Sequence, residues 1–275
     1  MARRYGATLT SDEIVRGIIR ANYHKSGPVK ALRLYTVHPA LMDKIRQDAA
    51  WILASQKPSI VTDAVHVTNW TKPSGDVRQF SLFNRSGCTD DTADDHTRTA
   101  EGKRFHLANR APGMRELAEF LAGAGLMGMR MNVLGPDSKL SPHEEHIVHR
   151  GAAFPELRVR FHLPITTNAG ALVLLDGDLH HLESGIIHFF NNGCVHAAEN
   201  GGQDDRVHLV WDMMLTEMCQ HLMFAGGLPA EIGRPCSSTK VPLVGRRDIG
   251  SFERYPDEVP FEEAETELGF VEAWA

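Results

Sequence analysis

The sequence lacks the features that mark secreted and membrane proteins. Its four cysteines, at positions 88, 194, 219 and 236, are scattered and form no CxxC pair. A disulfide framework is therefore not expected, and a reducing cytoplasm is the predicted location. No apolar run approaches the roughly 18 residues that a membrane helix needs. The first residues, MARRYGATLTSDE, contain two arginines but no apolar run after them, so no secretion signal is predicted.

An excess of positive charge is also missing. The 275-residue chain has a formal net charge of −6, which gives no basic footprint for a nucleic acid. We expect a small-molecule substrate as the partner, with no nucleic acid and no membrane, and the oligomeric state is left open. The length is sufficient for one large domain. We predict a single domain over 1–275 with an N-terminal helical or mixed section (1–125), a metal-binding core (126–215) and a C-terminal extension (216–275).

Histidine, in contrast, is abundant and clustered. Nine of the 15 histidines lie between His143 and His208. Such clustering of imidazoles indicates a metal site or an acid–base site, although several of the nine are expected to be ordinary core or surface residues. The densest stretch is PHEEH, residues 142–146, followed by His149.

Three stretches of the N-terminal section have the apolar spacing of helices. They are IVRGIIRANY (14–23), LMDKIRQDAAWILAS (41–55) and MRELAEFLAGAGL (114–126). Between the last two lie short β-like runs broken by the turn residues Pro73-Ser74-Gly75-Asp76. Trp70 and Gln79 belong to these runs, which would roof a barrel. Both are candidates for substrate contact, with ordinary packing as the alternative.

From about residue 127 the pattern changes to short β segments. LRVRFHLPITTN (157–168) and DRVHLVWDMML (205–215) alternate along their length. One face of each is apolar and the other is largely polar: Val159, Phe161, Leu163 and Ile165 oppose Arg158, Arg160 and His162, while Val207, Leu209, Trp211 and Met213 oppose Arg206, His208, Val210 and Asp212. Short strands at this spacing predict an antiparallel barrel or jelly roll. Cationic groups inside a barrel are costly unless an anion or a metal accompanies them.

The residues around PHEEH fit a metal site. On an extended strand, positions i and i+2 point to the same side, so His143 and Glu145 would grip one ion while Glu144 faces away. A downstream histidine, His196 in NNGCVHAAEN, completes a set of two histidines and one carboxylate, which suits non-haem Fe(II). Two alternatives stay open: a solvated turn without metal, and a helical zinc site built from His143, His146 and His149. The zinc-protease motif HExxH is excluded by the spacing.

Four segments carry a resemblance to a known family. PHEEH, RVRFHLPITTN, HFFNNGCVHAAEN and DRVHLVWD occur in an order and spacing that resemble the aspartyl/asparaginyl β-hydroxylase and proline hydroxylase group of oxygenases. The resemblance covers about residues 126–215. It implies a mainly β fold, a double-stranded β-helix (jelly roll, cupin-like), here with an N-terminal helical section. It also implies the cofactor Fe(II), the co-substrate 2-oxoglutarate and O2.

Site residues follow from the resemblance position by position. It implies His143, Glu145 and His196 as iron ligands and therefore as the catalytic centre. Arg206, His162 and Asn132 would hold 2-oxoglutarate, and Arg160 would meet a substrate carboxylate. Several members of the group have Asp or Gly at the position of Glu145, so the backbone must absorb the extra methylene of Glu. A carboxylate there also argues against halogenation.

The implied function is hydroxylation of an unactivated C–H bond in a small carboxylate-bearing substrate, an amino acid or a derivative. One alternative is hydroxylation of an Asp- or Asn-type side chain in a peptide or a carrier-bound intermediate. A second is a non-catalytic cupin-like protein that binds a metal or ligand. Arg206 and His162 discriminate against the second, because a plain cupin has no need of an inward arginine ten residues past its last ligand.

Overall fold

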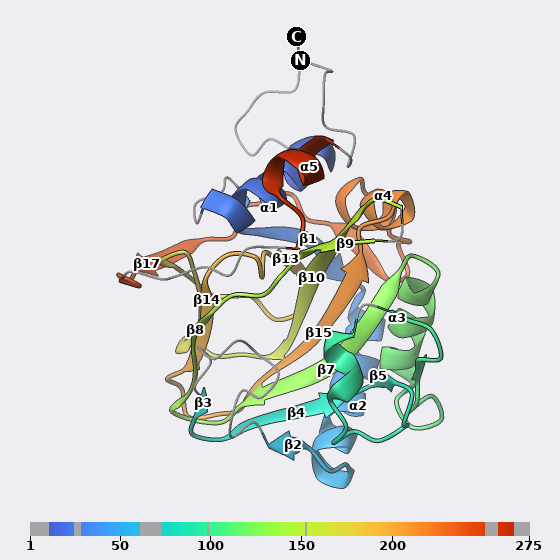
Figure 1. Cartoon of the computed structure of the whole chain (residues 1–275). Coiled ribbons are helices and arrows are strands. Elements are labelled where there is room, and N and C mark those ends of the chain that lie inside the picture. The colour runs from blue at the N-terminus through green and yellow to red at the C-terminus, as the bar shows by residue number, and fades with distance from the viewer. Residues whose placement is uncertain are drawn as a thin grey trace.

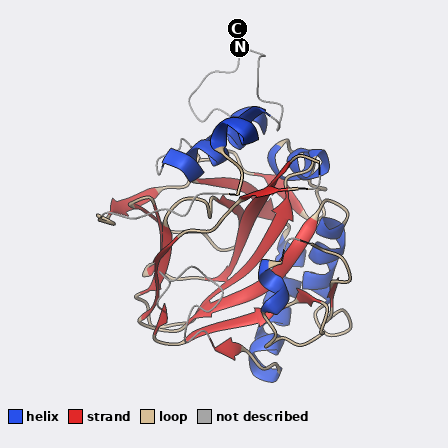
Figure 2. Cartoon of the chain, in the orientation of Figure 1, coloured by secondary structure: helices blue, strands red, loops and turns tan. Residues whose placement is uncertain are grey.

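The computed structural model describes residues 11–24, 29–60, 73–97, 99–151, 153–250 and 258–266. Two antiparallel sheets face each other, and helices cover the outer side of the larger one (Figures 1 and 2). Trp70 lies outside the described residues. None of the helices described is long and apolar enough to cross a membrane.

The strands divide between the two sheets as follows. In spatial order the larger sheet contains β16 (Gly233–Pro235), β1 (Ala31–Val37), β13 (Ile186–Phe190), β10 (Pro155–Thr166), β15 (Arg206–Met214), β7 (Leu126–Leu134), β4 (Val77–Ser81) and β2 (Ser59–Ile60), with β9 (Val148–Arg150) paired to β10. The smaller sheet contains β17 (Leu243–Arg246), β12 (Asp178–His180), β11 (Ala171–Leu175), β14 (His196–Asn200), β8 (Ser138–His143) and β3 (Pro73–Ser74). A separate ribbon pairs β5 (Phe83–Asn84) with β6 (Arg104–Phe105).

The chain crosses between the two sheets repeatedly. It passes from β7 to β8, from β10 to β11, from β12 to β13 and from β14 to β15, and each of these steps changes sheet. This winding is that of a double-stranded β-helix, so the predicted fold class is confirmed. The strands β8 and β14 are neighbours in the smaller sheet, whereas β10 and β15 are neighbours in the larger one.

The three predicted helices are confirmed. They are α1 (Ser11–His24), α2 (Pro39–Ser55) and α3 (Pro112–Ala122); the structure also contains η1 (Ala93–His96), α4 (Glu217–Phe224) and α5 (Phe261–Glu265). Proline occupies the first turn of both α2 and α3, where its missing N–H has no intrahelical partner to lose. Both helices pack on the outer face of the larger sheet.

The main hydrophobic core lies between the larger sheet and its helices. The alternation of β10 places Phe161 on this outer face, where it stacks on Trp211 of β15 with ring centroids 5.8 Å apart. Truncating such a buried aromatic side chain typically costs about 3–5 kcal/mol. The opposite faces of the same strands carry Arg160, His162 and Asp212 into the space between the two sheets. The predicted assignment of faces is therefore confirmed for both strands.

Residues 1–125 supply strands as well as helices. β1 lies between β13 and β16, and β4 lies beside β7, so strands from the mixed N-terminal section extend the larger sheet beyond the core predicted for 126–215. The strand ALRLYTV is difficult to recognise because its register shifts between Arg33 and Tyr35. This bulge resets the alternation after Leu34, so neither a helical nor a strand period fits the whole segment.

Candidate metal centre

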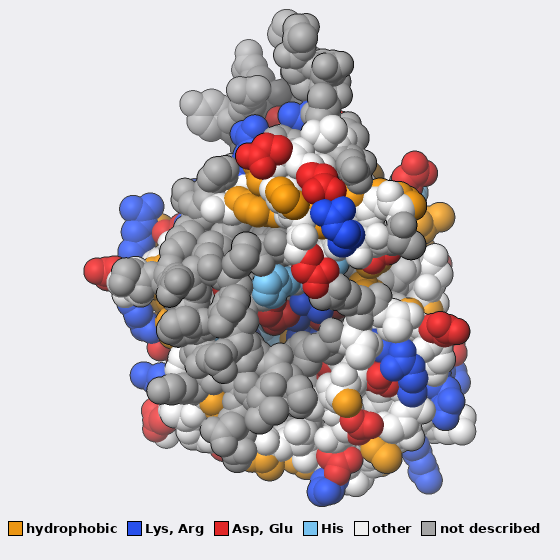
Figure 3. Space-filling model, viewed as in Figure 1, with side chains coloured by type: hydrophobic (Ala, Val, Ile, Leu, Met, Phe, Trp, Pro, Cys, Tyr) orange, Lys and Arg blue, Asp and Glu red, His pale blue; other side chains and the backbone are white. Residues whose placement is uncertain are grey.

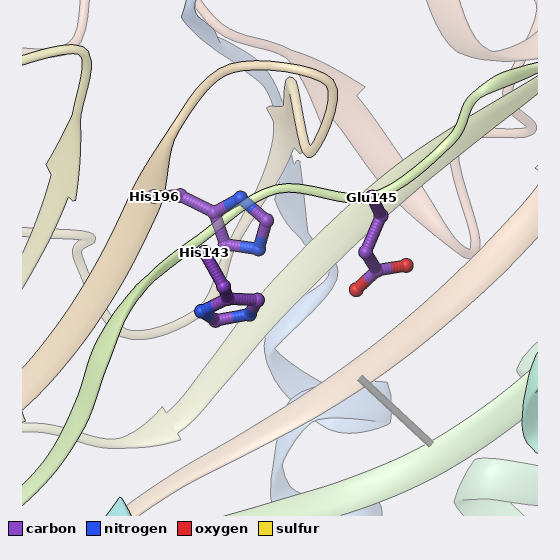
Figure 4. Close-up of side chains that lie close together, drawn as sticks. All are labelled: His143, Glu145 and His196. Atoms are coloured by element: carbon purple, nitrogen blue, oxygen red, sulfur yellow. The ribbon is translucent and has the colours of Figure 1, made fainter. Parts of the chain in front are cut away.

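Three predicted ligands lie together between the sheets. His143, Glu145 and His196 each present one ligand atom, and these atoms lie within 4.8 Å of one another (Figure 4). His143 ends β8 and is the direct cross-strand partner of His196, which begins β14. Their ring centroids are 4.1 Å apart. Two imidazoles and one carboxylate on one side of an ion are a donor set that suits non-haem Fe(II).

A local hydrogen bond fixes the tautomer of each histidine ligand. His143 Nδ1 lies 2.8 Å from the carbonyl oxygen of Ser141, and His196 Nδ1 lies 2.8 Å from that of Cys194. Because a carbonyl only accepts, Nδ1 carries the proton and the lone pair is on Nε2. Burial lowers the pKa of both rings, most strongly that of His196, where the neighbouring His143 adds to the effect. Both are therefore neutral and able to bind a metal at neutral pH.

Glu145 is held at the site by contacts that the alternation of side chains along a strand does not predict. His143 and Glu145 meet at one site, as predicted, but strand β8 ends at His143, so strand pairing does not hold Glu145 in place. The backbone N–H of Glu145 instead donates to the carbonyl oxygen of Asn192 at 3.1 Å. The Asn192 amide also donates to Glu145 Oε2 at 3.3 Å. The turn before β14 thus anchors the third ligand beside the second.

Two arginines of β10 hold the Glu145 carboxylate. Arg160 donates to both of its oxygens, with its Nη2 2.8 Å from Oε2, and Arg158 donates to Oε2 at 3.1 Å. Arg160 also grips Asp212, its direct partner on β15, through contacts of 2.7 and 3.0 Å. Arg130 of β7 adds a contact of 3.2 Å to Asp212. All three arginines are buried.

The charges in this network set one another's protonation. Burial opposes ionisation of Asp212, yet Arg160 and Arg130 outweigh burial and hold its pKa well below the ordinary range. Burial likewise opposes the charge on Arg160, but Asp212 and Glu145 raise its pKa overall. The buried Asp95 of η1 receives hydrogen bonds from Ser81 and Gln79, and burial raises its pKa. Asp95 therefore ionises less readily than Asp212.

The pocket between the sheets contains eight of the nine predicted site residues. They share an inward position on strands of both sheets or at a strand end: His143, Glu145, His196, Arg206, His162, Asn132, Arg160 and Gln79. The ninth, Trp70, lies outside the described part of the chain. Figure 3 shows histidine, acidic and basic side chains at the bottom of a hollow on the face seen in Figure 1.

Arg206 differs from the other arginines of the pocket. Its side chain is 3% exposed, and within the described residues it has no hydrogen bond or ion pair. Burial lowers its pKa to about 9, so it remains a cation at neutral pH. His162 lies nearby with its ring packed at a tilt against that of Phe190, and its Nε2 has no partner among the described residues. Burial, strengthened by Arg206, lowers the pKa of His162 well below its ordinary value.

Several residues of the site were not predicted from the sequence. Arg130 and Asp212 are recognisable in retrospect, because alternation places them on the same faces as Asn132 and Arg206. Arg158 is placed by alternation on the face of Arg160, but its contact with Glu145 depends on the irregular segment 144–147. Asn192 carries no such signal, because it lies in a turn.

Comparison with known proteins gives a family and a set of structures of similar fold. A model of the family described as aspartyl/asparaginyl beta-hydroxylase matches residues 42–215. No curated protein matches the chain.

Among solved structures, a 2OG-Fe(II) oxygenase family oxidoreductase from Burkholderia pseudomallei is 12% identical, with a TM-score of 0.38, and the match covers 60% of this chain and 76% of that one. HygX from Streptomyces hygroscopicus, with nickel and 2-oxoglutarate bound, is 10% identical, with a TM-score of 0.39 and coverage of 67% and 84%. A prolyl-4-hydroxylase from Pseudomonas putida is 14% identical, with a TM-score of 0.35 and coverage of 72% and 98%.

Proposed function

The chain belongs to the aspartyl/asparaginyl β-hydroxylase family of Fe(II)- and 2-oxoglutarate-dependent oxygenases, and from this premise we propose that it hydroxylates a C–H bond of a small carboxylate-bearing substrate, an amino acid or a derivative. The observation that carries the oxygenase activity is the position of Arg206. A buried, uncompensated guanidinium in the same pocket as a set of two histidines and one carboxylate needs an anionic ligand.

The residues present fit the implied cofactor and co-substrate. His143, Glu145 and His196 would hold Fe(II), and their neutral imidazoles need lose no proton to do so. Arg206 would donate bidentate hydrogen bonds to the 2-oxoglutarate carboxylate that is remote from the metal, and His162 and Asn132 would lie beside that carboxylate. When bound, iron with 2-oxoglutarate and O2 supplies the oxidising power for an unactivated C–H bond.

The protein's own contribution is to bind, orient and exclude water. Val77, Leu134 and Val173 give the pocket apolar walls. Such walls keep the local dielectric low and strengthen every charge contact inside. His162 packs against Phe190 with ring centroids 4.6 Å apart, which fixes the orientation of its free Nε2.

The charge balance of the pocket supports an anionic substrate. Four buried arginines (130, 158, 160 and 206) lie with Glu145, which is largely buried, and with the buried acids Asp95 and Asp212. The two charges of Fe(II) and the two of 2-oxoglutarate cancel. Among these seven side chains one positive charge is in excess, which supports a carboxylate-bearing substrate. Four of the five N–H donors of Arg160 engage Glu145 and Asp212, which leaves one Nη1 donor for its predicted contact with that carboxylate.

A succinate-release screen tests the proposal. Purified protein is supplied with Fe(II), 2-oxoglutarate and O2, and free amino acids and their derivatives are compared with the same residues inside peptides. We expect stimulation of succinate formation by free amino acids, with a matching gain of one oxygen atom in the product by mass spectrometry. Stimulation by peptides alone would replace the small-substrate proposal with the peptide alternative.

The cofactor requirement is tested separately and without a substrate. Fe(II) and 2-oxoglutarate added together under anaerobic conditions should give a weak visible absorption band that neither gives alone. Its absence from folded protein would contradict the assigned site.

A further inference from the structure

We propose that Asp212 is a positioning residue that acts through Arg160 to hold Glu145 as a metal ligand. The inference rests on the proposed function, because it concerns the same metal centre. It accounts for a buried acid that does not line the pocket and that the proposed chemistry does not otherwise use.

Glu145 needs support that the two histidines do not. His143 and His196 lie on paired strands and are oriented by carbonyls two residues before them. Glu145 lies in an irregular segment, and its side chain has one more rotatable bond than an aspartate at that position would have. Side chains must therefore fix the position of its carboxylate. Arg160 contacts both of its oxygens.

Asp212 in turn fixes Arg160. The two residues are direct cross-strand partners, and the Asp212 carboxylate meets Arg160 Nε at 2.7 Å and Nη2 at 3.0 Å. On its other side Asp212 pairs with Gly128 of β7. Arg160 Nη2 thus contacts both acids, Glu145 at 2.8 Å and Asp212 at 3.0 Å. The planar fork of a guanidinium transmits orientation from one carboxylate to the other.

The negative charge of Asp212 also favours metal binding by Glu145. Asp212 neutralises part of the positive charge of Arg160 and Arg130. Without Asp212, the whole charge of Arg160 would compete with a metal for the electrons of Glu145 and would repel the metal itself. Loss of Asp212 should therefore weaken metal binding through both effects. Groups that orient metal ligands typically contribute about 10- to 100-fold to metal affinity.

The test is anaerobic titration with Co(II) alone, which reports affinity and, through its visible absorption, coordination geometry. Asp212→Asn keeps the shape and removes the charge. We expect about 10- to 100-fold weaker Co(II) binding and an altered visible spectrum. Arg160→Lys keeps the charge and removes the fork, and we expect the same altered spectrum.

The matched control is Glu199→Gln. Glu199 lies on β14, the strand of His196, and makes a comparable two-contact pair with Arg247 at 2.8 and 2.9 Å outside the metal-binding set. This variant should bind Co(II) as the parent protein does. A purely structural role of Asp212 would lower the unfolding midpoint but leave the spectrum of the Co(II)-saturated protein unchanged.

The outcomes separate this inference from the proposed function. If His143→Ala abolishes Co(II) binding while Asp212→Asn and Arg160→Lys keep the parent affinity and spectrum, the positioning role is wrong and the metal centre stands. If His143→Ala binds Co(II) like the parent, the metal centre itself is wrongly assigned. Where Asp212→Asn does not fold, Arg160→Lys decides by the same criterion.

Discussion

At the scale of single residues, the pKa of arginine is shifted in opposite directions at two positions in one pocket. Arg160 is surrounded by two carboxylates, which raise its pKa despite burial. Arg206 faces no such partner in the described structure, and burial lowers its pKa to about 9. A paired arginine is a structural element, whereas an unpaired buried arginine marks a place for an anionic ligand.

Replacing Arg206 with methionine should separate stability from binding. The free energy of unfolding of the ligand-free protein should rise by about 1 kcal/mol, because an uncompensated buried charge is removed. The dissociation constant for 2-oxoglutarate should increase by about 10- to 100-fold, since charge-assisted hydrogen bonds contribute about 1.5–3 kcal/mol. Denaturant titration and calorimetry measure the two quantities. Arg247→Met, at an exposed arginine, should leave 2-oxoglutarate binding unchanged.

The buried His188 predicts a pH dependence of stability. Burial, assisted by Arg33, lowers its pKa to about 3 from an ordinary value of 6.5. Between these values the unfolded chain binds a proton that the folded protein does not, so stability rises with pH across this window and levels off above it. His188→Gln should reduce the slope by about one proton, or about 1.4 kcal/mol per pH unit.

Denaturant titrations of the ligand-free protein at several pH values from 4 to 8 measure that slope. The exposed His221 provides a matched control as His221→Gln. An unchanged slope in His188→Gln would show that His188 is not held neutral by the fold.

At the scale of elements, function depends on where strands end. β8 stops at His143 and β14 starts at His196, so the two ligands meet at one end of a strand pair. The irregular segment after β8 and the turn before β14 then bring Glu145 and Asn192 together. Strand pairing fixes the positions of the two histidines, whereas the irregular backbone of residues 144–147 brings the Glu145 carboxylate to them.

The turn between β11 and β12 gives a prediction at this scale. Asp176 and Gly177 have φ values of +46° and +83°, as a two-residue hairpin turn requires. Gly177→Ala should lower the free energy of unfolding by about 1–2 kcal/mol, because the left-handed conformation is strained with a Cβ. That Cβ would also lie 3.0 Å from the carbonyl oxygen of Arg247.

Chemical denaturation measures this loss. Gly123→Ala is the control, because Gly123 has φ −66° and ψ −15°, and a Cβ there would lie 3.8 Å from the Phe120 carbonyl oxygen, an ordinary van der Waals distance. A loss of similar size in both variants would mean that backbone strain at the turn is not the cause.

At the scale of the whole molecule, the pocket joins the two sheets. His143 and His196 belong to the smaller sheet, whereas Arg206 and His162 belong to the larger one. The space between the sheets holds polar and charged side chains beside apolar ones, and the main hydrophobic core lies on the outer side of the larger sheet. A metal and a dicarboxylate bound together would therefore connect sheets that apolar packing connects only in part.

This arrangement predicts that ligands stabilise the fold. Each ligand at 100 times its dissociation constant adds about 2.7 kcal/mol to the free energy of unfolding. We expect the unfolding temperature to rise with Co(II) and 2-oxoglutarate under anaerobic conditions and to fall again with a chelator. His143→Ala should lose the response to Co(II). A chelator-insensitive unfolding temperature in the parent protein would contradict the prediction.

The sequence by itself determined the sheet faces and the candidate ligands. Alternation in the stretches 157–168 and 205–215 separates the apolar from the polar face because side chains of a strand point to opposite sides. The Asp176-Gly177 hairpin turn is likewise local, because an Asp-Gly pair readily adopts the two positive φ angles of such a turn. The rule needs only neighbouring residues, so no knowledge of the fold is required.

Only the tertiary structure decided which charges meet. The contact of Glu145 with Arg158 and Asn192, and the pairing of Arg160 with Asp212, join segments 13 to 52 residues apart. The bulge in β1 and the early end of β8 likewise depend on neighbours that are distant in sequence. The energy of a buried charge is set by everything within several ångströms, and a linear pattern does not contain those distances.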